Sequence, residues 1–172
     1  AGRADKALEW AERGLVAFPQ RTDGRLREFL IGEYLQRGRG AEAMKLAWAQ
    51  FAERSDLGGY TGLKATVRQA DGDWPNWRDR ALKHLRQDIA REFTERNKTG
   101  YARMAAPDRS RLVEVLLSEQ DIEAAWREAE TGGCRDELRL RLADLRAEDH
   151  PEDSLAIYRR QAASLIEQTN TP

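Results

Sequence analysis

The chain has 172 residues, of which 34% are charged, and its formal net charge is only -1. This length fits one domain or one compact array of repeats, and the balanced charge does not indicate whole-molecule attraction to nucleic acid or membrane. No segment approaches the roughly 20 apolar residues of a membrane span, and the single cysteine, Cys134, excludes an internal disulfide. We therefore predict a cytoplasmic protein with no membrane partner.

One pattern occurs twice near the start of the chain. Residues 2–18 read "GRADKALEWAERGLVAF", and residues 38–55 read "GRGAEAMKLAWAQFAERS". Ala7 and Ala11 recur as Ala43 and Ala47, in each case four positions apart on one helix face. Small side chains at this spacing let a neighbouring helix approach closely. We expect Ala43 and Ala47 to be buried against the helix before them, which carries Leu30.

The segment between the two copies, "DGRLREFLIGEYLQRG", predicts a further helix that Gly38 closes. The repeating unit is then helix, glycine turn, helix, and its period of about 34 to 36 residues is typical of a tetratricopeptide-like array. Leu30, Tyr34, Gly38 and Ala43 fall on the large, aromatic, turn and small positions of that motif. Gly72 lies 34 positions after Gly38 and predicts the next turn.

The rest of the chain continues the helical pattern after one interruption. A long helix is predicted from about residue 76 to 96, and "KTGYARMAAP" then predicts an irregular connector. The expected organisation is tetratricopeptide-like hairpins over 1–97, the connector over 98–107, and further hairpins over 108–172. The predicted fold is all-α, a right-handed α-solenoid of antiparallel helical hairpins with about nine helices and no strand.

Four phrases carry a resemblance to a known family: "ADKALEWAERGLVAFP", "RLREFLIGEYLQRGRGAEAM", "GDWPNWRDRAL" and "HPEDSLAIYRRQAASLIEQT". Together they resemble the C-terminal helical region of bacterial SWIM zinc-finger family proteins. The resemblance implies a helical interaction module attached to an upstream zinc-binding portion, which is linked to nucleic-acid or protein interaction. One cysteine and two histidines do not supply that zinc motif here. The first helix also resembles the second half of a hairpin, so we expect this chain to be a segment of a longer protein.

The sequence offers little catalytic or metal-binding chemistry. His84 and His150 are far apart, and no CxxC, GxSxG, Walker or GxGxxG motif is present. Glu152 and Asp153 suit the capping of a predicted helix start. A helix start would lower the thiol pKa of Cys134, although a small buried residue is the favoured interpretation. We predict no catalytic residue, no cofactor and no metal, and hence not an enzyme.

The leading hypothesis is a scaffold that holds a peptide or protein segment on a concave face lined by the first helices of the hairpins. In the repeat register, the side chains that point toward this face are those of Arg25, Glu28, Gln36, Thr66 and Gln69. The identity of the partner is left open.

The alternative hypothesis is an accessory nucleic-acid-binding module that uses the basic helix over residues 76–98. Its candidate contacts are Arg86, Arg91 and Arg96, and ordinary solvation of that face competes with this interpretation. Nucleic acid would also be a partner through the rest of a longer protein.

Overall fold

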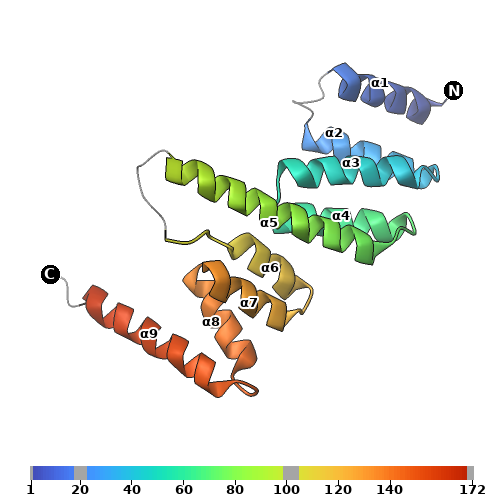
Figure 1. Cartoon of the computed structure of the whole chain (residues 1–172). Helices are drawn as coiled ribbons and strands as arrows, with labels where there is room; N and C mark the ends of the chain where they lie inside the picture. The colour runs from blue at the N-terminus through green and yellow to red at the C-terminus, as the bar shows by residue number, and fades with distance from the viewer. Residues whose placement is uncertain (1, 18–22, 99–104, 170–172) are drawn as a thin grey trace. The chain divides into compact units, whose positions relative to one another are not determined.

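A computed structural model describes residues 2–17, 23–98 and 105–169, and the regular structure in this part of the chain is all α-helix with no strand (Figure 1). The helices before the gap at 99–104 are α1 (Arg3–Ala17), α2 (Gly24–Gln36), α3 (Gly40–Glu53), α4 (Leu57–Gln69) and α5 (Trp74–Lys98). The helices after it are α6 (Ser110–Ser118), α7 (Ile122–Gly132), α8 (Asp136–Arg146) and α9 (Pro151–Thr169). The predicted all-α fold and the number of helices are confirmed over these residues. None of the described helices is long and apolar enough to cross a membrane.

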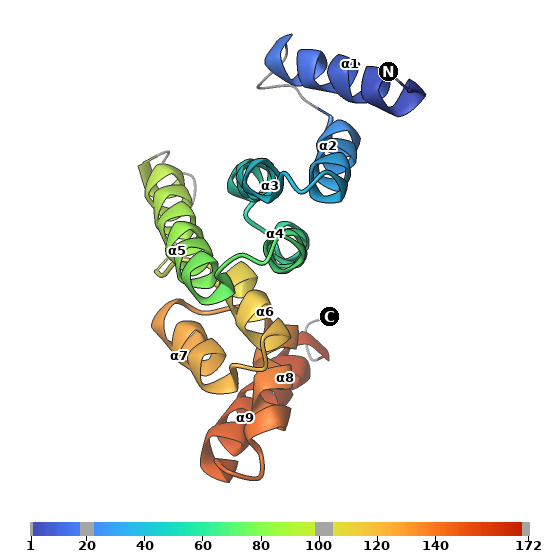
Figure 2. The ribbon, with the colours of Figure 1, turned by 90° about the vertical axis from the view of Figure 1, so that its right-hand side faces the viewer.

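The chain divides into two compact units, Ala1–His84 and Leu85–Pro172, and the boundary falls within α5. Inside each unit, helices that are adjacent in sequence pack together: α2 on α3 and α3 on α4 in the first, α6 on α7 and α8 on α9 in the second. Figure 2 views α2, α3 and α4 nearly along their axes and shows them side by side. Contacts also join α2 to α4 and α6 to α8. In each case the first helix of one hairpin touches the first helix of the next. This nearest-neighbour pattern is that of a helical repeat.

The predicted connector over 98–107 includes residues outside the described part of the chain. Lys98 is the last residue of α5, and residues 105–109 precede α6 without regular structure. The expected division at this connector stays a prediction.

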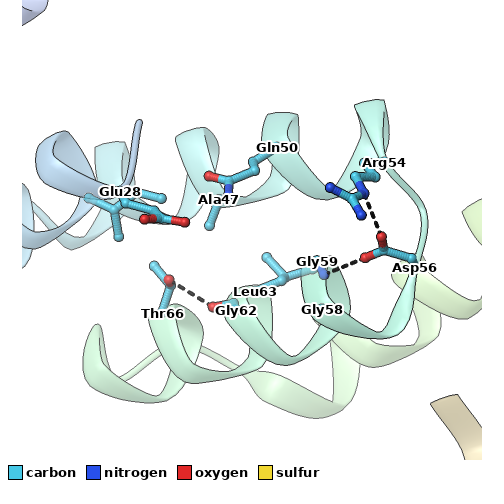
Figure 3. A pocket seen from close by; sticks show the side chains of 11 residues that line it. Glu28, Ala47, Gln50, Arg54, Asp56, Gly58, Gly59, Gly62, Leu63 and Thr66 are labelled. Atoms are coloured by element: carbon cyan, nitrogen blue, oxygen red, sulfur yellow. Dashed lines mark hydrogen bonds and ion pairs between the residues drawn. The ribbon is translucent and has the colours of Figure 1, made fainter. Parts of the chain in front are cut away.

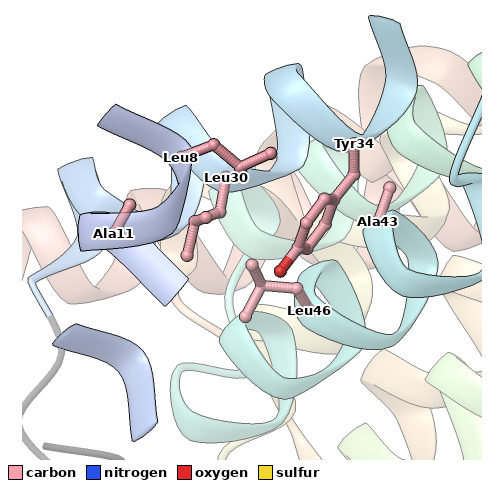
Figure 4. Close-up of a cluster of buried hydrophobic side chains, with 6 residues drawn as sticks. All are labelled: Leu8, Ala11, Leu30, Tyr34, Ala43 and Leu46. Carbon is pink, nitrogen blue, oxygen red and sulfur yellow. The ribbon is translucent and has the colours of Figure 1, made fainter. Parts of the chain in front are cut away.

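A core cluster joins the first three helices, and small residues let them approach (Figure 4). Ala43 is fully buried and Ala47 is 4% exposed. Ala43 belongs to the same buried cluster as Leu30 and Tyr34, so its predicted burial against α2 is confirmed. The cluster consists of Leu8, Ala11, Leu30, Tyr34, Ala43 and Leu46. In α1 only one of the two corresponding alanines is buried: Ala11 is buried, whereas Ala7 is exposed.

Three helices end in the same type of hydrogen-bonded turn, the Schellman motif, in which a residue with positive φ follows the helix. Gly38 takes this conformation after α2, with φ +70, and the Arg39 N–H donates to the Tyr34 carbonyl at 2.8 Å. Asp71 (φ 51) and Gln120 (φ 60) do so after α4 and α6, and the same backbone bonds follow them. The turn that ends the first helix of a pair is therefore the repeating feature of this fold.

The prediction that Gly72 occupies the turn position of Gly38 is wrong by one residue, because Asp71 has the left-handed conformation. Aspartate tolerates it better than most residues because its short polar side chain bonds locally. Gly72 is required for a different reason. A Cβ there would lie 2.7 Å from the Met44 Sδ atom and 3.0 Å from a Val67 methyl carbon.

Candidate functional site

A groove opens between α2, α3 and α4, with a cavity volume of about 450 Å³ (Figure 3). Helix α2 contributes Glu28 and Ile31, α3 contributes Ala47 and Gln50, and Arg54 follows directly after α3. The remaining lining residues run from the N-cap of α4 to its last turns, and they are Asp56, Gly58, Gly59, Gly62, Leu63 and Thr66. The groove lies wholly within the first compact unit.

Glycines in the segment "DLGGYTG" explain why this space exists. At Gly59 a Cβ would lie 2.8 Å from the Arg54 carbonyl oxygen, so the missing side chain lets the chain turn closely from α3 into α4. At Gly62 a Cβ would meet no atom within 4 Å, so the missing side chain leaves open space. Gly59 therefore serves the packing of the helices, and Gly62 keeps the groove unfilled.

The polar groups of the groove differ in how they are satisfied. The Asp56 carboxylate accepts a hydrogen bond from the Gly59 N–H at 2.8 Å and pairs with the Arg54 guanidinium at 2.7 Å. The Thr66 hydroxyl donates to the Gly62 carbonyl at 2.9 Å. The Gln50 Oε1 atom is buried and accepts no hydrogen bond from the described residues. A buried acceptor without a donor costs about 1–3 kcal/mol, so the Gln50 side chain gains free energy from any donor that its Oε1 atom can reach.

The predicted concave-face residues divide into two groups. Glu28 and Thr66 line the groove together, one from α2 and the other from α4. Arg25, Gln36 and Gln69 are exposed, and none of them lines this cavity.

Sequence reasoning missed the polar contribution of the second helix. Gln50 lies near the end of α3, and Arg54 and Asp56 lie in the link to α4, whereas the prediction considered the first helix of each hairpin alone. The glycine-rich "DLGGYTG" was the available signal, because glycines within a helix mark either close packing or open space.

Arg86 and Arg91, two of the three basic-face candidates, form ion pairs with carboxylates of the same compact unit. The Arg86 Nε atom donates to the Glu128 carboxylate at 2.8 Å, and the Arg91 guanidinium pairs with Asp88. Arg96 is exposed. The ion pairs of Arg86 and Arg91 reduce the positive potential that this face would offer to phosphate groups.

His84 lies among aromatic rings. Its ring centroid is 5.5 Å from that of Trp48 and 5.8 Å from that of Phe51, and its Nε2 atom is buried without a hydrogen-bond partner among the described residues. Arg80 stacks over Trp48 at 3.9 Å from the ring centroid. The surroundings of His84 are thus those of a packed side chain.

A small cluster at the start of α9 offers three groups that could hold a metal ion. Ligand atoms of His150, Glu152 and Asp153 lie within 4.8 Å of one another. Asp153 already accepts a hydrogen bond from the buried Arg146 at 3.0 Å, and the His150 ring lies 3.9 Å from the Glu152 carboxylate. Carboxylates at a helix start are also favoured by the helix dipole, so the cluster has a structural role. The expectation that the chain binds no metal stays a prediction.

Cys134 precedes α8, as expected, but its thiol is not activated. Burial, the largest influence, raises the pKa of Cys134, although the positive charge of Arg139 opposes this effect. The lowering expected from a helix start is outweighed. The protonated thiol dominates at neutral pH and is a poor nucleophile.

Comparisons with protein-family models, with curated proteins and with solved structures find no match to this chain. The groove is therefore the feature of the described residues that best indicates a function. Its apolar floor and a few convergent polar groups are the features that ligand sites in proteins share.

Proposed function

We propose that this chain is a non-catalytic helical-repeat scaffold that binds a segment of another protein in the groove between α2, α3 and α4. Helical repeats use the surfaces formed by successive first helices for extended ligands. The observation that carries the proposal is the open groove itself, with a Gln50 Oε1 atom in its wall that is buried and has no hydrogen-bond partner among the described residues.

The size and chemistry of the groove suit a short stretch of polypeptide. Ile31, Ala47 and Leu63 give it an apolar surface, and Glu28 and Gln50 add hydrogen-bond acceptors. A polypeptide segment supplies both partners, because its side chains cover the apolar surface and its N–H groups donate to the acceptors.

We also propose, on the resemblance of its four phrases, that the module is part of a bacterial SWIM zinc-finger-like protein that acts in the cytoplasm. Binding of nucleic acid through the basic helix has less support, because Arg86 and Arg91 pair with Glu128 and Asp88. Measuring nucleic-acid affinity as a function of salt tests that alternative, since phosphate contacts weaken steeply as salt rises.

The proposal is tested by a substitution that places a side chain in the groove and so blocks it. Gly62→Gln places a side chain at the lining of the groove, where nothing lies within 4 Å of the new Cβ, so the fold accommodates the change. Gly32→Gln is the matched control, because Gly32 is also a helical glycine with nothing within 4 Å and lies outside the groove lining.

The measurement is binding of the purified protein to an array of random peptides. We expect the unmodified chain and Gly32→Gln to bind the same peptides, and Gly62→Gln to lose them. Equal binding by Gly62→Gln, or no peptide bound by any of the three proteins, would contradict the proposed function.

A further inference from the structure

We infer that the groove selects a segment carrying a cationic side chain, lysine or arginine, and that Glu28 and Gln50 receive its charged end. This inference rests on the proposed function and names the chemistry of the bound segment. It follows from the charges, the acceptors and the apolar surface that line the groove.

The charges at the two ends of the groove are not equivalent. Near the start of α4, Arg54 and Asp56 neutralise each other through their ion pair at 2.7 Å. On α2, the exposed Glu28 carboxylate lies within ion-pair distance of no basic group in the part of the chain that the structure describes. The unbalanced charge in the lining is therefore negative, and it belongs to Glu28.

The second acceptor lies on the facing helix. Figure 3 shows Gln50 on α3 and Glu28 on α2 bordering the same space, across from Thr66 and Gly62 on α4. The Gln50 Oε1 atom is buried and takes a hydrogen bond from none of the described residues. A lysine ammonium carries three N–H donors and an arginine guanidinium five, so either group has enough donors for both acceptors.

The apolar surface suits the stem of such a side chain. The partly exposed Ile31 supplies most of this surface, beside the buried Ala47 and Leu63 in the lining. Lysine and arginine cover apolar surface with their methylene groups while their heads remain polar. A glutamate in the same place would bring its charge toward Glu28 and leave the Gln50 acceptor without a donor.

The test uses three acetylated and amidated pentapeptides, Ala-Ser-Xaa-Ser-Ala, in which Xaa is lysine, norleucine or glutamate. Norleucine keeps the lysine stem and removes only the ammonium group. Binding to the full 172-residue chain is followed by NMR through the backbone amide signals of Gly59 and Gly62, which line the groove.

We expect the lysine peptide to bind about two- to fivefold more tightly than the norleucine peptide, the range that partly exposed ion pairs give. The glutamate peptide should bind most weakly. Glu28→Gln should remove the preference for lysine, whereas Asp79→Asn, a change of an exposed carboxylate on α5 outside the groove, should keep it.

The other outcomes separate this inference from the proposed function. Equal binding of the lysine and norleucine peptides would overturn the selection of a cation while leaving a peptide-binding groove. Tightest binding of the glutamate peptide would also overturn it and would assign the dominant role to Arg54. If no peptide shifts the Gly59 and Gly62 signals at millimolar concentration, both the inference and the groove as a peptide site are wrong.

Discussion

At the scale of single residues, the packing of α3 against α2 depends on a side chain of one carbon. Ala43 is fully buried in the cluster with Leu30 and Tyr34. Ala43→Leu should destabilise the fold by about 1–3 kcal/mol, because the added carbons force α2 and α3 apart even though leucine is apolar and forms helices well. Denaturant unfolding monitored by circular dichroism measures the change in free energy.

The matched control is the neighbouring position on the same helix. The Glu42 side chain is 48% exposed and pairs with Arg39 at 3.0 Å, and an exposed pair of this kind contributes little. Glu42→Gln should change the unfolding free energy by less than about 0.5 kcal/mol. A neutral or stabilising Ala43→Leu would show that the repeated alanines do not set the helix spacing.

Asp108 makes a pH-dependent contribution at the start of α6. Burial by itself raises the pKa of this carboxyl, but hydrogen bonds from the Ser110 hydroxyl and N–H, helped by the charges of Arg135 and Arg111, lower it overall. The Ser110 N–H and hydroxyl donate to the Asp108 Oδ1 atom at 2.9 and 2.6 Å.

A carboxyl whose pKa is lowered by folding stabilises the folded state above its unfolded pKa of about 3.9, and the contribution disappears as the pH falls through the folded pKa. Asp108→Asn should therefore destabilise the protein at pH 7, and the difference from the unmodified chain should shrink below about pH 4. Denaturant unfolding at several pH values measures it. A difference that stays constant from pH 7 to pH 3 would contradict this account.

At the scale of the element, two glycines of α4 should respond in opposite directions to the same substitution. Gly62→Ala should stabilise the fold by about 0.5–1 kcal/mol, because alanine loses less backbone entropy in a helix and its Cβ meets nothing within 4 Å. Gly59→Ala should destabilise it, because the Cβ would lie 2.8 Å from the Arg54 carbonyl oxygen. Thermal and denaturant unfolding of both variants give the signs, and equal signs would contradict the two roles assigned here.

The helices were predictable from sequence because their apolar spacing and their breakers are local signals. The long helix expected over about 76–96 is α5, Trp74–Lys98. The sequence placed the left-handed residue after α4 at Gly72, one residue late, because glycine is the usual residue in that conformation. In the structure Asp71 has the left-handed conformation, and Gly72 is required by its close packing against Met44. Sequence spacing likewise treated Ala7 as equivalent to Ala43, although Ala7 is exposed.

At the scale of the whole molecule, the candidate site was only partly predictable. Repeat spacing identified Glu28 and Thr66 because their positions on successive first helices follow from helix geometry. Gln50 was not identified, because its place in the groove depends on how closely α3 approaches α4. That approach depends on Gly59, where a Cβ would meet the Arg54 carbonyl oxygen, and on the Asp56 cap, and the spacing of the two helices follows only once the link between them is folded.

The nearest-neighbour packing of the helices predicts how far along the chain a core substitution lowers stability. In an array of nearest-neighbour contacts, stability is a sum of terms for each repeat and each interface, so damage decays with distance along the chain. Phe51 in α3 and Leu142 in α8 are both fully buried, and replacing either by alanine leaves a cavity that costs about 2–5 kcal/mol. Phe51→Ala should reduce the hydrogen-exchange protection of amides mainly in α2, α3 and α4, and Leu142→Ala mainly in α8 and α9, because these helices contact one another. Native-state hydrogen exchange of both variants measures the pattern. If each change lowers protection evenly through all the described helices, the chain unfolds as one cooperative body and the array description of its stability is wrong.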